Sequence, residues 1–226
     1  METAIGIIFG GILTILVAVW VEWLRRPKLK LSIEPPIDIM INPGNLNSRS
    51  LRVLASNASL SRFLFFMVRS PALQCRATIT FHRHADGQDI FGKPMAARWA
   101  GALQPNSIPI VDNAGNVVSR ILDPERIGVG SRMDIYPGEF EPLDIVARIE
   151  NDPECYGWNN ETYFTQPFGR NQNWKLAADR FLARVTITSS GQKCIGVFRL
   201  INDVPRNVFR LELANREEIL KIECAG

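Results

Sequence analysis

The two histidines of the chain, His82 and His84, have the spacing that most resembles a metal site. Residues two apart in a strand point to the same face of a sheet, and Asp86 and Asp89 follow closely. Imidazole and carboxylate groups together bind zinc. Both histidines, however, fall on the polar face of a strand predicted over residues 74–84, where solvent is the expected neighbour. We therefore predict no metal ion and no cofactor.

A polar and aromatic segment without a clear period, NDPECYGWNNETYF, covers residues 151–164. Loops carry binding residues more often than strands do, and aromatic and amide groups together suit a surface for a peptide or a sugar. The alternative is that the rings fill one end of a core, because rings of this size bury well. The candidate binding residues here are Tyr156, Trp158, Asn160 and Tyr163.

An unbroken apolar run, Phe63–Val68, lies between two arginines in the sequence SRFLFFMVR. It has three interpretations: contact with a membrane surface, burial in the core, or a surface for a partner. The sequence leaves all three open. Phe65 and Phe66, at the centre of the run, join the candidate binding residues.

The acidic residues are scattered, and their spacing singles out no pair for acid–base chemistry. The chain contains no GxSxG, no P-loop, no GxGxxG after a predicted strand and no HExxH. We therefore expect a protein that is not an enzyme. The net charge of +3 is too small to indicate the dense basic face of a nucleic-acid-binding protein.

The clearest element predicted from the sequence is an apolar segment near the N-terminus. Residues 4–21 carry no charge, and 11 of these 18 residues are Ile, Leu, Val or Phe. A helix over about residues 4–24 would be roughly 31 Å long, close to the roughly 30 Å of a bilayer's hydrocarbon core. Its apolar residues favour insertion by about 3–6 kcal/mol. We predict one transmembrane α-helix.

The residues at the downstream end of this segment set its orientation. Trp20 and Trp23 are typical of a membrane interface, and Arg25 and Arg26 open a short basic stretch. The positive-inside rule then places the short N-terminus outside and the C-terminal domain in the cytoplasm. A cleaved signal peptide is the competing interpretation, but it requires positive charge before the apolar run and small residues at its exit.

Two further features of the predicted anchor bear on its partners. Gly6 and Gly10 form a GxxxG pattern, which lets two membrane helices approach closely and makes a homo-oligomer possible. Glycine is also common in membrane helices generally. The cations after the helix can attract anionic lipid, although they also serve simply to fix topology.

A cytoplasmic location has consequences for the cysteines and the glycosylation sequons. Asn57 and Asn160 lie in sequons that would then go unused. The four cysteines form no CxxC pair, and we expect free thiols at Cys75, Cys155, Cys194 and Cys224.

The remainder of the chain alternates between apolar and polar residues with a period of two. Clear strands are predicted over residues 28–34, 50–57, 74–84, 142–149, 180–189, 193–202 and 208–213, with shorter ones near 108–111 and 117–121. The fold expected is mainly β: an antiparallel β-sandwich, immunoglobulin-like in the broad sense. The predicted division is an anchor over residues 1–27 and a soluble domain over residues 28–226.

These features together predict a single-pass, signal-anchor membrane protein whose sandwich is a non-catalytic protein-interaction module at the cytoplasmic face. Its expected partners are the lipid bilayer and another protein, because tethering raises the concentration of the module near other membrane proteins. The alternative is a small-ligand or lipid-binding domain that uses the Phe63–Val68 run and the 151–164 loop. An enzyme with an unrecognised site is a third interpretation.

Overall fold

The computed structural model describes the backbone of residues 2–41, 46–61, 63, 67–102, 107–112, 114–122, 131–165, 167, 169–190 and 192–225. For residues 2–8, 41, 46, 107–109, 117 and 119–122 it describes the backbone alone.

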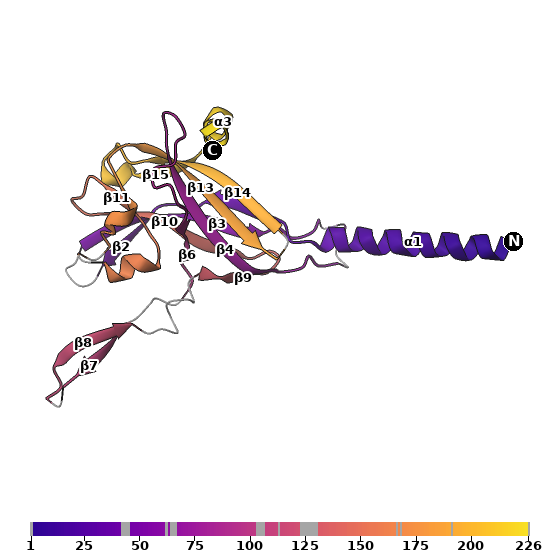
Figure 1. The fold of residues 1–226 in the computed structure, drawn as a ribbon, viewed down its shortest axis with the longest axis horizontal. Helices are drawn as coiled ribbons and strands as arrows, with labels where there is room; N and C mark the ends of the chain where they lie inside the picture. The colour runs from indigo at the N-terminus through magenta and orange to yellow at the C-terminus, as the bar shows by residue number, and fades with distance from the viewer. Residues whose placement is uncertain are drawn as a thin grey trace.

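The N-terminal helix α1 (Glu2–Arg25) projects from one end of a β domain (Figure 1). Its extent agrees with the helix predicted over residues 4–24. Among the residues whose side chains are described, which in this helix begin at Phe9, no helix has the length and apolar character needed to cross a membrane. The helix itself is therefore confirmed, whereas its transmembrane character stays a prediction.

Two antiparallel sheets form the β domain, as predicted. The first contains β1 (Leu29–Ile33), β2 (Ile37–Ile41), β3 (Leu46–Asn57), β6 (Arg98–Trp99), β10 (Phe140–Ile149), β11 (Cys155–Gly157) and β12 (Lys175–Leu176). The second contains β4 (Ala72–Arg83), β5 (Met95–Ala96), β9 (Met133–Ile135), β13 (Arg180–Ser189), β14 (Gln192–Ile201) and β15 (Arg210–Leu213).

A separate hairpin of β7 (Ser107–Val111) and β8 (Val117–Leu122) stands away from both sheets (Figure 1). The remaining described elements are three 3-10 helices, η3 (Asn160–Phe164), η4 (Gln172–Trp174) and η5 (Arg206–Val208), and the C-terminal helix α3 (Arg216–Ala225). The immunoglobulin-like part of the fold prediction and the division at residue 27 stay predictions.

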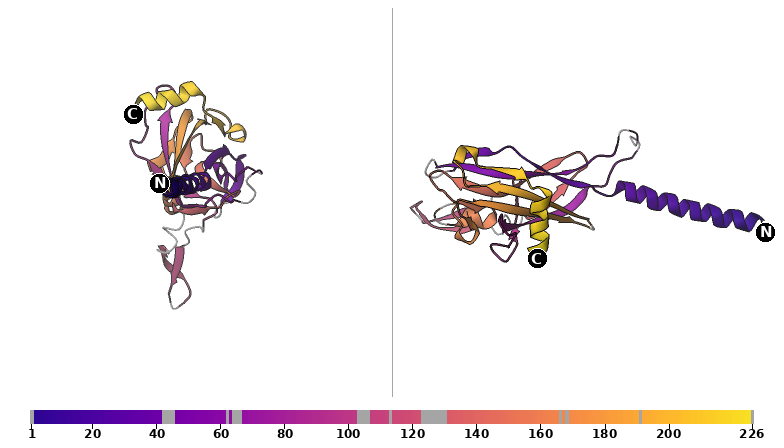
Figure 2. Two further views of the ribbon diagram at one scale, coloured as in Figure 1. Left: turned by 90° about the vertical axis from the view of Figure 1, so that its right-hand side faces the viewer. Right: turned by 90° about the horizontal axis from the view of Figure 1, so that it is seen from above.

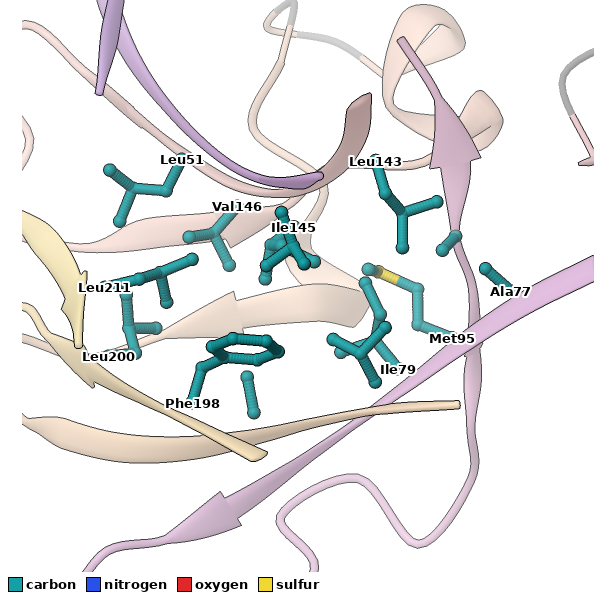
Figure 3. Close-up of a cluster of buried hydrophobic side chains, with 14 of the residues drawn as sticks. Leu51, Ala77, Ile79, Met95, Leu143, Ile145, Val146, Phe198, Leu200 and Leu211 are labelled. Carbon is teal, nitrogen blue, oxygen red and sulfur yellow. The ribbon is translucent and has the colours of Figure 1, made fainter. Parts of the chain in front are cut away.

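The core lies between the two sheets and is filled by the inward face of each strand (Figure 3). In β4 the alternating apolar residues from Cys75 to Phe81 are all buried, and β13 pairs with this strand in register over eight positions. Because successive side chains of a strand point to opposite faces, the alternation of apolar and polar residues gives β4 one buried face and one polar face. The buried face of β4 consists of Cys75, Ala77, Ile79 and Phe81.

Two strands depart from strict alternation. A register shift between Asp144 and Val146 brings Val146 into the core as well as Ile145, because a β-bulge adds one residue to its strand. Beyond the bulge, Ala147 and Ile149 are also buried, although they lie outside the main core cluster. Leu213 has the same phase as the buried Phe209 and Leu211, yet it lies at the end of a short edge strand and is 65% exposed.

The C-terminal tail forms helix α3 (Arg216–Ala225). Its N-terminus carries a reciprocal cap: the Glu218 N–H donates to Asn215 Oδ1 (2.9 Å), and the Asn215 N–H donates to Glu218 Oε2 (2.7 Å). The helix buries Ile222 and reaches the turn after β4, where Gly87 lies against the Lys221 carbonyl.

We expect Gly87→Ala to loosen this contact. Gly87 has φ +76°, and an added Cβ would lie 2.5 Å from the Lys221 oxygen. Left-handed strain and a backbone clash together should cost about 1–3 kcal/mol in the free energy of unfolding. The matched control is Gly92→Ala, which has φ +63° but nothing within 4 Å of the new Cβ. Thermal unfolding of the detergent-solubilised chain measures both; equal losses would show that the α3 contact contributes nothing.

Candidate functional site

The end of the β domain nearest α1 is organised around one buried amide. Asn57, the last residue of β3, is 0% exposed. Its side-chain oxygen accepts a hydrogen bond from the Lys28 N–H (3.0 Å), and its Nδ2 donates to the carbonyls of Ser70 (3.0 Å) and Ile135 (3.2 Å). Both amide donors are therefore used. We call this network, with the backbone groups bonded to Asn57, the α1 junction.

The backbone of Asn57 adds a second set of bonds at the same place. Its N–H donates to the Glu139 carbonyl (3.3 Å), and its own carbonyl accepts from the Gly138 N–H (2.8 Å). One residue thus joins the start of β1, the connection before β4 and the turn between β9 and β10. These segments are far apart in the sequence, so the bonds fix how the two sheets meet at this end.

The last turn of α1 is held by the connection between β3 and β4. The Ser70 N–H donates to the Arg25 carbonyl (2.6 Å), and Arg69 Nη1 donates to the Arg26 carbonyl (2.8 Å). The carbonyls at a helix C-terminus lack intrahelical partners, so these two donors satisfy groups that would otherwise need water. Figure 1 shows the β3–β4 connection lying beside the domain end of α1.

The segments that meet at the α1 junction carry exposed apolar side chains. They include Trp23, Phe63, Val68, Tyr136 and Phe140, which we call the apolar rim. Phe63 is 90% exposed, so the burial expected as one alternative for the Phe63–Val68 run does not hold for its first residue. Phe65 and Phe66, the candidates at its centre, lie outside the described residues.

The predicted anchor residues lie where the sequence placed them, at the end of α1. Trp20, Trp23, Arg25 and Arg26 are all exposed. Gly10 has open space on its Cβ side, whereas the surroundings of Gly6 lie outside the described side chains. Self-association through this helix stays a prediction.

The aromatic segment 151–164 lies at the opposite end of the domain, around β11 and η3 (Figure 1). Tyr156 is buried in β11 and is no surface residue. Trp158 and Tyr163 meet edge to face with centroids 5.8 Å apart, and both are half-buried. The candidate binding residues therefore do not form one surface with the described ends of the Phe63–Val68 run.

A buried arginine that the sequence gave no reason to single out holds this aromatic segment in place. Arg98, 1% exposed, donates to Asn160 Oδ1 (2.7 Å) and to the Ala102 carbonyl (2.7 Å), and its guanidinium stacks 4.9 Å from the Tyr163 ring centroid. Asn160 and Tyr163 are thus engaged inside the domain. This favours the interpretation that the rings close one end of the structure.

The histidines do not face solvent as expected. His82 is buried, with Nε2 2.8 Å from Thr80 Oγ1 and Nδ1 2.9 Å from the Gly87 carbonyl oxygen. His84 Nε2 lies 2.8 Å from Glu218 Oε1 on α3. The expectation was wrong for His82, which bonds within its own strand and the following turn, whereas His84 is half-buried beside α3. Among the described residues there is no group of three or more His, Cys, Asp or Glu placed to hold a metal ion.

Two buried carboxylates, Asp144 and Glu218, have shifted ionisation. Burial raises the pKa of the Asp144 carboxyl, although Arg52, 2.7 Å away, and Arg98 act to lower it. For Glu218, burial acts to raise the pKa, but the Asn215 N–H, His84 and Arg199 together lower it. Both carboxylates are paired with cations across strands or to a helix, a structural arrangement for buried charge.

All four cysteines are free, as expected. Burial raises the pKa of the Cys75 thiol to about 11 and raises that of Cys155 further, and it also raises the pKa of Cys194. Cys224 is the exposed one.

A groove of about 670 Å³ runs between β1, β14, β15 and α3. Its lining is mainly apolar, including Ile195, Val197 and Ile219, with Lys30 and Arg184 as cations. None of the sequence-predicted site residues contributes to it.

Comparison with protein-family models, curated proteins and solved structures gave no match to this chain.

We expect Asn57→Ala to destabilise the α1 junction. The substitution leaves two carbonyls and one N–H unpaired in a buried position, at a cost of about 2–4 kcal/mol in the free energy of unfolding. Asn57→Asp should cost at least as much, because a carboxylate accepts from Lys28 but cannot donate to either carbonyl. The control is Asn207→Asp at an exposed position. Calorimetry of the purified chain measures all three; a junction variant matching the control would contradict this account.

Proposed function

We propose that the chain is a single-pass membrane protein in which α1 crosses the bilayer. The support comes from the uncharged length of residues 4–21 and from the exposure of the apolar side chains described along α1, such as Phe9, Ile15 and Val19. Apolar side chains on a helix that projects into water would be costly to leave uncovered. A bilayer of matching thickness removes that cost.

The proposed orientation places the N-terminus outside and the β domain on the cytoplasmic side. Arg25, Arg26 and Lys28 follow the apolar run, whereas Met1, Glu2 and Thr3 before it carry no positive side chain. Positive charge near the end of a spanning helix is retained in the cytoplasm.

We further propose that the β domain is a non-catalytic protein-interaction module, with the β7–β8 hairpin as its binding arm. The observation that carries this proposal is the hairpin's position apart from both sheets, with Val111 and Val118 exposed (Figure 2). A two-stranded hairpin is marginally stable by itself in water. Exposed β-branched side chains on such an arm are suited to pairing with a partner.

Hydrogen bonds to the Asp112 side chain hold the turn at the tip of the hairpin. Asp112 Oδ1 accepts from the N–H groups of Ala114 and Asn116 (both 2.9 Å), and Gly115 takes φ +84°. The hydrogen bonds from Asn116, above all from its N–H, hold the pKa of the Asp112 carboxyl below its usual value. A turn closed by its own side chains can present the two strands before any partner arrives.

The native Cys224 tests the topology. Because the other thiols are buried or half-buried with raised pKa values, a membrane-impermeant maleimide should react mainly with Cys224, and only after cells are permeabilised. Cys224→Ser should abolish most of that labelling. A second variant, Thr3→Cys, should be labelled in intact cells. Labelling of Cys224 without permeabilisation would exclude a cytoplasmic β domain.

The binding arm is tested with a photo-crosslinking residue in place of Val118, compared with the same residue at the exposed position of Asn207. In intact membranes we expect Val118 to give one discrete adduct with a different protein, and Asn207 to give none. An adduct containing only this chain, or the same adducts from both positions, would count against the proposed module. Val118→Asp, assayed by co-purification, should reduce recovery of the adduct partner.

A further inference from the structure

We propose that the end of the β domain nearest α1 docks on the headgroup layer of an anionic phospholipid bilayer. This inference rests on the proposed membrane anchoring, and it adds a lipid-binding surface on the domain itself. The surface consists of the apolar rim together with the exposed cations around it.

The apolar rim has the composition of a membrane interface. Trp23, Phe63, Tyr136 and Phe140 are exposed aromatic residues from three separate segments, and Val68 adds an exposed aliphatic side chain. Aromatic rings prefer the headgroup region, where one part of the ring is dry and another is wet. In a domain with a filled core, so many exposed rings at one end indicate a surface that is covered in use.

The α1 junction places the rim at the level of the helix end. Ser70 bonds to the Arg25 carbonyl, which brings Val68 beside the last turn of α1. Tyr136 follows Ile135 and Phe140 follows Glu139, both of which bond to Asn57. Figures 1 and 2 agree that the β3–β4 connection and α1 lie at the same end of the β domain. A helix that crosses the bilayer therefore brings the rim to its surface.

Positive charge exceeds negative charge at this end. Among the described residues, eight cations stand against four acids, Glu22, Asp134, Glu139 and Glu141. Burial, together with Glu139, raises the pKa of the Glu141 carboxyl. The cations are Arg25, Arg26, Lys28, Lys30, Arg69, Arg76, Arg132 and Lys193.

Several of these cations form no ion pair with a described acidic side chain. Arg69 donates to the Arg26 carbonyl and Arg132 donates to Gln74 Oε1, which are both neutral acceptors. Arg76 and Lys193 flank Thr188 in a single row across β4, β13 and β14. Basic side chains close to a cytoplasmic leaflet are attracted to anionic lipid, and salt screens that attraction.

The test uses the full chain reconstituted in phosphatidylcholine vesicles with and without phosphatidylserine. An environment-sensitive fluorophore is attached at Phe63→Cys or Phe140→Cys in a Cys224→Ser background, and quenching by headgroup-labelled nitroxide lipid is measured. Reference labels are Leu13→Cys in α1 and Val118→Cys in the hairpin. We expect several-fold stronger quenching at Phe63 and Phe140 than at Val118, increased by phosphatidylserine and reduced by salt.

The outcomes separate the two proposals. Quenching of Leu13 by acyl-chain-labelled lipid, with Phe63 and Phe140 quenched no more than Val118, would overturn the docking and leave the anchoring intact. Absence of quenching at Leu13 would overturn the anchoring and the docking with it.

A charge-neutralised pair tests the lipid preference. Arg76→Gln with Lys193→Gln should remove most of the phosphatidylserine dependence at Phe63, whereas Arg83→Gln with Arg216→Gln makes the same change of charge at exposed positions elsewhere and should preserve it. Equal loss in both pairs would overturn the anionic preference.

Discussion

The arrangement of this protein depends on the burial of one side-chain amide. Asn57 ends β3 in a dry position, and a buried amide is stable only when its donors and acceptor are all paired. The three groups that pair with it belong to Lys28, Ser70 and Ile135, which lie on different segments. Satisfying Asn57 therefore requires the linker from α1, the β3–β4 connection and the β9–β10 turn to be in place together. A single polar requirement thereby couples the helix to both sheets.

Most of the sheet structure follows from the sequence because period-two alternation is a local signal. The strand predicted over residues 180–189 coincides with β13, and those predicted near 74–84 and 142–149 correspond to β4 and β10 with small shifts at their ends. The hairpin was likewise expected, since its turn residues are adjacent to the strands they join. In β10 a bulge interrupts the alternation, and both faces of the strand are buried from Leu143 to Ile149.

The candidate site was harder to predict because its contacts are not local. Arg98 meets Asn160 across 62 positions of sequence, so the aromatic segment could not be assigned to the interior from its own composition. His82 and His84 looked solvent-facing, but His82 bonds to Thr80 and Gly87, and His84 meets Glu218 on α3, more than a hundred residues later. Asn57 did carry a signal: it shares the phase of Leu51, Val53 and Ala55, and a polar residue in a core phase needs internal partners. From the sequence, Asn57 was considered only as part of a glycosylation sequon, and not as a buried hydrogen-bonding residue.

The tie between α1 and the domain also has a mechanical side. Only Arg26, Pro27 and Lys28 separate the helix from β1, and proline restricts the backbone at the centre of this short linker. Because the last turn of α1 is also bonded to Ser70, the helix and the β domain are joined at two places. A spanning helix tilts to match the thickness of its membrane. If α1 spans a bilayer as proposed, any such tilt would be transmitted through the junction, so bilayer thickness itself would set the angle at which the β domain meets the membrane surface.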